Sequence, residues 1–143
     1  MKRKDIDPAM AGRLAETLRQ HGPLAGLAVD AAVSLIRLGT LVELEPGEAL
    51  IREDEEAAAE IYLLVEGAFV VKSKSGMVAR LNRPGDVVGE VAVLLSSQRT
   101  ADVIADSAVR AVAISAKALE MPEYAEVASA VGGAMLRDDW IKY

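Results

Sequence analysis

Glycine turns recur through the middle of the chain and divide it into short segments rich in Val, Ile and Leu. They stand at Pro46-Gly47, Glu66-Gly67, Ser75-Gly76 and Pro84-Gly85. From Thr40 the hydrophobic period changes to two, because Val42 and Leu44 alternate with acidic residues. Short strands between regularly spaced glycine turns are typical of a β-sandwich or barrel. The middle of the chain therefore predicts a core made of strands.

Four strands can be placed within this core. Residues 61–65 and 68–71 flank the turn at Gly67, and we predict that they pair with each other. Residues 103–104 and 109–114 are rich in Val and Ile and supply the last strands.

Helices are predicted on both sides of the strands. Asp7-Pro8 combines an N-cap with a first-turn proline and starts a helix that runs up to the break at Gly22-Pro23. A second helix is predicted over about residues 30–38. After the strands, residues 115–119 form a short helical turn, and a longer helix follows over about residues 122–137.

The composition favours one acidic domain. The chain has 143 residues, and its 52% hydrophobic content is enough for a single core. With 22 acidic and 16 basic residues the net charge is -6, which opposes binding to nucleic acid or anionic lipid. The absence of cysteine excludes disulfides and Cys-ligated metals. Since no signal peptide or long apolar span is visible, we expect a soluble, cytoplasmic protein that binds neither nucleic acid nor membrane.

The stretch after the last glycine turn combines groups suited to a half-buried phosphodiester. Such an anion needs backbone N–H groups and a paired cation. Arg99 supplies the cation, and Gly89 permits a close approach. The N–H groups of Val91 and Ala92, at the start of one helical turn, donate to the same phosphate. Glu90 is badly placed against a phosphate but well suited to accept a hydrogen bond from a ribose 2′-hydroxyl.

The same stretch resembles the phosphate-binding cassette of the cyclic-nucleotide-binding domain family, whose members are receptors for cAMP or cGMP. That cassette has Gly-Glu, a small apolar run, then Arg, a small residue and Ala, which Gly89-Glu90 and Arg99-Thr100-Ala101 match. The resemblance covers roughly residues 24–137. It implies a mainly β fold with flanking helices: a double-stranded β-helix, or cupin-like jelly-roll, with N-terminal helices and a C-terminal lid helix. We therefore expect an N-terminal helix over 1–23 and the binding domain over 24–143, a single domain overall.

The resemblance also implies where the nucleotide binds. The predicted ligand-binding residues are Val88, Gly89, Glu90, Val91, Ala92, Arg99, Thr100 and Ala101. The lid residues expected to cover the purine are Met135, Leu136 and Trp140. Thr100 can donate its hydroxyl to a phosphate oxygen or to a purine edge. The register of the strand before Pro84 stays open by one residue, so either Arg80 or Leu81 faces the purine.

The sequence shows no recognisable set of catalytic residues. Cupin enzymes share the roll, but their metal centres need two or three converging histidines, and this chain has only His21. For His21 we predict a capping or surface role. No nucleophile is paired with a base.

We therefore predict a non-enzymatic receptor without a metal or cofactor. It is expected to signal the occupancy of its site through the C-terminal helix to a protein partner or a covalently attached effector domain. The alternative is a pseudo-receptor that uses the same fold only as a protein-interaction scaffold.

Overall fold

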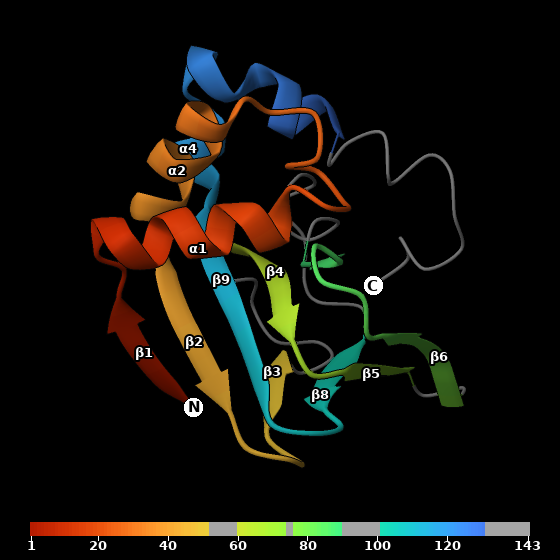
Figure 1. Cartoon of the computed structure of the whole chain (residues 1–143). Helices are drawn as coiled ribbons and strands as arrows, with labels where there is room; N and C mark the ends of the chain where they lie inside the picture. The colour runs from red at the N-terminus through yellow and green to blue at the C-terminus, as the bar shows by residue number, and fades with distance from the viewer. Residues whose placement is uncertain (52–59, 74–75, 90–100, 131–143) are drawn as a thin grey trace.

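The computed structural model describes residues 1–51, 60–73, 76–89 and 101–130 (Figure 1). In chain order the elements are β1 (Lys2–Asp5), α1 (Pro8–Leu18), α2 (Val29–Arg37), β2 (Thr40–Leu44), β3 (Ala49–Ile51), β4 (Glu60–Glu66), β5 (Phe69–Ser73), β6 (Gly76–Leu81), β7 (Val87–Val88), β8 (Asp102–Ala105), β9 (Val109–Ser115), α4 (Ala116–Leu119) and the 3-10 helix η1 (Pro122–Tyr124). The strands form a five-stranded sheet, β1-β2-β9-β4-β7, and a four-stranded sheet, β3-β8-β5-β6. All strand pairs are antiparallel. The mainly β roll with flanking helices is thus confirmed.

The helices begin where the local sequence signals predict. At the start of α1 the Asp7 carboxylate accepts a hydrogen bond of 2.8 Å from the Met10 N–H, and Pro8 occupies the first turn. The short helix α4 is capped in the same way, because the Ser115 hydroxyl oxygen accepts a bond of 3.2 Å from the Ala118 N–H. The helix predicted over 30–38 is found at Val29–Arg37. The helix predicted to start at Pro122 begins as η1 and continues as α-helix over residues 125–130.

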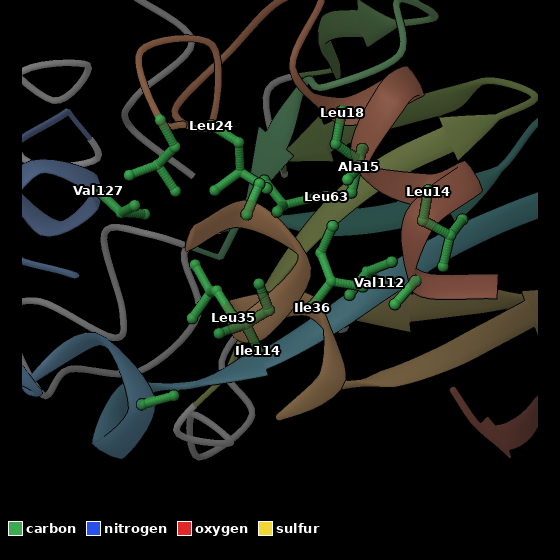
Figure 2. Close-up of a cluster of buried hydrophobic side chains, with 14 of the residues drawn as sticks. Leu14, Ala15, Leu18, Leu24, Leu35, Ile36, Leu63, Val112, Ile114 and Val127 are labelled. Carbon is green, nitrogen blue, oxygen red and sulfur yellow. The ribbon is translucent and has the colours of Figure 1, made fainter. Parts of the chain in front are cut away.

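The central strands of the five-stranded sheet are buried on both faces. Side chains of a strand point alternately to opposite faces, and along β4 both sets are apolar. Ile61, Leu63 and Val65 pack under α1 and α2 in a cluster that we call the helix-side core (Figure 2). Tyr62 and Leu64 join a second cluster between the two sheets, which we call the roll interior. The other buried members of the roll interior are Val42, Leu44, Ile51, Phe69, Val71, Leu81, Val88, Ala101, Val103, Ala105, Val109, Ala111 and Ala113.

The N-terminal strand β1 was not predicted. Where only a helix was expected within residues 1–23, Lys2–Asp5 pairs with β2 along one edge of the five-stranded sheet. All four of its residues are exposed, so hydrophobic periodicity gave no signal for it. Ion pairs hold the strand in place: Arg3 contacts Glu60 at 2.8 Å, and Lys4 contacts Glu43 at 2.8 Å.

The predicted pairing of residues 61–65 with 68–71 is wrong. β4 pairs with β7 and β9 in the five-stranded sheet, whereas β5 pairs with β6 and β8 in the four-stranded sheet. Gly67, at a φ of 93°, makes the corner at which the chain passes from one sheet to the other. The Ala68 N–H donates to the Ser107 hydroxyl at 3.1 Å, which fixes this corner against the β8–β9 connection. A corner of this kind and a hairpin turn look alike in sequence.

The roll interior makes the first testable prediction. Phe69 on β5 is only 1% exposed, so Phe69→Ala should lower the free energy of unfolding by about 3–5 kcal/mol through lost burial and the cavity left behind. Urea unfolding followed by circular dichroism measures the loss. The control is Val29→Ala at a position 49% exposed, which should change the value by less than about 0.5 kcal/mol. Similar losses in the two variants would contradict the assigned burial.

Candidate functional site

The cassette predicted from sequence leaves the five-stranded sheet at Gly89. Val88, the last residue of β7, pairs with Tyr62 of β4 and is 1% exposed in the roll interior. Gly89 follows at a φ of 91°, in the left-handed region that L side chains rarely adopt. The chain thus turns out of the sheet at the residue that the cassette pattern requires to be glycine.

The other end of the cassette returns to the four-stranded sheet. Ala101 is 2% exposed in the roll interior, directly before β8. β7 lies in one sheet and β8 in the other. The residues between Gly89 and Ala101 therefore connect the two sheets, and both ends of this connection are fixed by buried side chains.

The groups predicted to contact the ligand lie mostly outside the described residues. Of the eight predicted binding residues, the structure describes Val88, Gly89 and Ala101 and brings them to the two buried ends of the connection. Those outside the described residues are Glu90, Val91, Ala92, Arg99 and Thr100. The predicted lid residues Met135, Leu136 and Trp140 also lie outside them.

The register of β6 places Leu81, not Arg80, on the inner face of the four-stranded sheet. Leu81 is 9% exposed and belongs to the roll interior, opposite Phe69. Arg80 points the other way and forms an ion pair with Asp106 on the outside of the four-stranded sheet. Leu81 is therefore the residue that faces inward.

The turn just before β7 is held by His21, a residue that no sequence motif connects with the site. His21 Nε2 lies 2.8 Å from Asp86 Oδ1, and the two side chains are 30% and 18% exposed. The other carboxylate oxygen, Oδ2, accepts a hydrogen bond of 3.0 Å from the Arg83 N–H. The predicted capping or surface role of His21 is thus replaced by a long-range contact. Only the unusual Gly-Pro break after His21 marked this loop in the sequence.

Two glycines let the α1–α2 loop approach this turn closely. A Cβ on Gly85 would lie 1.9 Å from the His21 carbonyl oxygen, and one on Gly22 would lie 2.1 Å from the Gly85 carbonyl oxygen. Both glycines also have positive φ, at 98° and 89°. The loop and the turn therefore cross backbone to backbone, with no room for a side chain between them.

The C-terminal helical segment is anchored on the helix-side core. Tyr124 of η1 is 3% exposed and Val127 is fully buried, in the same cluster as Leu24 of the α1–α2 loop (Figure 2). Burial, reinforced by the charge of Glu123, raises the pKa of the Tyr124 phenol, and a hydrogen bond with Ser34 of α2 partly offsets this. The helix predicted over about residues 122–137 thus begins with one buried face.

Among the described residues no three His, Asp or Glu side chains are grouped so as to hold a metal ion. No helix within the described ranges is long and apolar enough to span a membrane.

A family model decides the classification of the chain. The model of the cyclic nucleotide-binding domain matches residues 41–121, more than half of the sequence. The chain belongs to the cyclic nucleotide-binding domain family. The match includes β2 to α4 and the whole cassette connection. The family assignment made from the cassette pattern is thus confirmed.

Solved structures of kinase regulatory subunits and of a transcriptional regulator have a similar fold. The regulatory subunit of a cAMP-independent protein kinase A from Trypanosoma brucei is 26% identical, with a TM-score of 0.76 over 91% of this chain and 48% of that one. The regulatory domain of Toxoplasma gondii protein kinase A, crystallised with cAMP, is 18% identical, with a TM-score of 0.77 over 92% and 50%. The N-terminal domain of a Streptomyces coelicolor transcriptional regulator is 25% identical, with a TM-score of 0.69 over 85% and 92%.

The present chain spans about half the length of the two kinase regulatory chains. No curated protein sequence matches it significantly.

The close backbone contact at Gly22 and Gly85 can be tested by adding a Cβ atom at Gly85. Gly85→Ala should lower the free energy of unfolding in urea by about 2 kcal/mol more than Gly47→Ala does, because only at Gly85 must backbone atoms move. Gly47 is a matched control, since its φ of 89° imposes a similar strain but nothing lies within 4 Å of its added Cβ. Equal losses would show that φ alone requires glycine at position 85.

Proposed function

We propose that this chain is a non-enzymatic receptor for a cyclic nucleotide, cAMP or cGMP, that regulates a protein partner or an attached effector domain. The observation that carries the proposal is the family match over residues 41–121. Within that range the chain has the cassette residues Gly89-Glu90 and Arg99-Thr100-Ala101. A cyclic nucleotide needs the Arg for its phosphodiester and the Glu for its ribose hydroxyl, and the chain has both.

In this proposal each cassette group has a separate task. Arg99 neutralises the phosphodiester through charge-assisted hydrogen bonds. The backbone N–H groups of Val91 and Ala92 donate to the same phosphate. Glu90 accepts a hydrogen bond from the ribose 2′-hydroxyl and so selects ribose over deoxyribose. The buried positions of Val88 and Ala101 support this arrangement, because they fix both ends of the connection that carries these groups.

We assign the purine to the apolar side of the roll. Leu81 and the half-buried Ala79, both on β6, contribute apolar surface next to the roll interior. A flat purine ring gains free energy when such a surface covers it. Thr100 donates either to the phosphate or to a purine edge, and the latter would favour guanine through its 2-amino group.

The second candidate is a protein-interaction scaffold that keeps the fold without binding cAMP. It is favoured by one comparison, since the Trypanosoma brucei regulatory subunit that resembles this chain belongs to a protein kinase A described as cAMP-independent. A direct titration with cAMP and cGMP separates the two candidates.

The phosphate contact gives the sharpest test of the receptor. Arg99→Ala removes hydrogen bonds that contribute about 1.5–3 kcal/mol each, so affinity for cAMP or cGMP should fall by at least about a hundredfold. Isothermal titration calorimetry with both nucleotides measures the change. The matched control is Arg110→Ala, which removes the same charge from an arginine that pairs with Glu43 and Glu66 on β2 and β4. Its affinity should equal that of the wild type.

The titration has one outcome that contradicts the receptor function and one that contradicts only the role of Arg99. If the wild type released no heat with either nucleotide, the scaffold would be favoured. If the wild type bound and Arg99→Ala bound equally well, the phosphate would have to lie elsewhere.

We further propose that occupancy is signalled through the C-terminal helix. Its described beginning is anchored by Tyr124 and Val127 on the helix-side core. Further along the sequence stand Gly132 and Gly133, and each interior glycine disfavours a helix by about 1 kcal/mol relative to alanine. Helix beyond Ser129 therefore needs a tertiary contact, and a bound purine covered by Met135, Leu136 or Trp140 supplies it.

This coupling predicts a gain of order on binding. Amides of residues 132–143 should become more protected from hydrogen exchange when a saturating cyclic nucleotide is present, because the lid then has a surface to cover. A double variant, Gly132→Ala with Gly133→Ala, should pre-form the helix and tighten binding. Exchange measured by mass spectrometry on the Arg99→Ala variant, with the same nucleotide, serves as the control. Protection that is unchanged by ligand in the wild type would exclude the C-terminal helix as the signal.

A further inference from the structure

The α1–α2 loop reaches the turn that leads into the cassette, and His21 is the contact. His21 and Asp86 are 65 positions apart in sequence, yet Nε2 and Oδ1 lie 2.8 Å apart. When Nε2 carries a proton it donates to the carboxylate. The two side chains are 30% and 18% exposed, against 54% and 30% for Lys4 and Glu43, which form a surface pair at the same distance. Because the His21 pair is the less solvated of the two, its hydrogen bond is screened less.

Backbone hydrogen bonds and strand pairing fix the position of Asp86 relative to the cassette. Its backbone oxygen accepts a hydrogen bond of 2.8 Å from the Leu64 N–H, and the Gly85 N–H donates to the Leu64 oxygen at 2.8 Å. Only the buried, β4-paired residues Val87 and Val88 separate Asp86 from Gly89. The position of Gly89, the first residue of the cassette, therefore depends on the orientation of the turn at Asp86.

The same loop is tied to the helices on its other side. Arg19 Nε donates a hydrogen bond of 2.8 Å to the Leu27 oxygen, which closes the loop on itself. Leu24 is fully buried in the helix-side core together with Val127 of the C-terminal helical segment. One short loop thus contacts both the turn before the cassette and the cluster that anchors the last helix.

We propose that His21 is a positioning residue for nucleotide binding: it does not touch the ligand but holds Asp86, and through β7 sets Gly89 for the phosphate. This inference rests on the proposed receptor function. The loop and the turn meet at the tight crossing of Gly22 and Gly85, and the imidazole adds a side-chain hydrogen bond that joins them. Loss of its hydrogen bond should loosen the turn and lower affinity without unfolding the domain.

Three substitutions at His21 separate its hydrogen bond from its bulk. His21→Ala should raise the Kd for the cyclic nucleotide about tenfold. In His21→Gln the amide nitrogen stands as many bonds from Cα as Nε2 does, so affinity should return close to the wild-type value. In His21→Asn the amide is one bond shorter, and binding should resemble that of His21→Ala. Lys4→Ala, which removes the surface pair with Glu43, should leave the Kd unchanged.

A spectroscopic measurement completes the test. His21 is the chain's single histidine, so its imidazole nitrogen resonances are identified without assignment. They should shift when cAMP or cGMP saturates the wild type and stay unchanged when Arg99→Ala receives the same nucleotide. Urea unfolding of each variant shows whether the fold is retained.

The possible failures are distinct. If the wild type bound neither nucleotide, the receptor function would fail and the role of His21 with it. Suppose that the wild type and His21→Ala bound the nucleotide equally well, and that the imidazole resonances of the wild type did not shift on binding. Only the positioning role would then be overturned. An equal loss of affinity in His21→Gln and His21→Ala would also overturn it, because packing rather than the hydrogen bond would then be responsible.

Discussion

The architecture depends on a five-stranded sheet whose central strands are buried on both faces. Apart from Arg110, the residues inside β4 and β9 are buried, so one set of side chains packs under the helices and the other fills the roll. An ordinary two-layer sandwich needs only one buried face per sheet. Here the central strands are shared by two cores, and the helices cannot move relative to the roll without disturbing the sheet between them.

This shared sheet defines the surroundings of the cassette. The connection that carries Glu90 and Arg99 starts from β7 in the five-stranded sheet and ends at β8 in the four-stranded sheet. Its two ends are fixed by Val88 and Ala101, both buried in the roll interior. In the proposed receptor, the position of the bound nucleotide therefore depends on both sheets.

Local signals were sufficient for much of this fold. Asp7 with Pro8, and Ser115, cap helices through bonds that span three residues, so the sequence pattern contains the whole interaction. The cassette pattern likewise identified Gly89, whose positive φ the structure shows. Strand β1 escaped prediction because its residues are exposed and their partners, such as Glu60, are distant in sequence. The exchange of sheets at Gly67 and the contact of His21 with Asp86 escaped for the same reason, since no periodicity encodes a long-range partner.

The two long-range contacts of the α1–α2 loop bear on how a signal can travel. Coupling between distant sites requires an element whose arrangement both sites bias. In the proposed receptor the α1–α2 loop is placed to meet this requirement, because its His21 contacts Asp86 and its Leu24 is buried in the same core as Val127. Because Gly22 and Gly85 cross without space between them, a displacement of the turn cannot be absorbed at the crossing by a side-chain rotation. In this proposal such a displacement moves the loop backbone, and with it Leu24 in the core that also holds Val127.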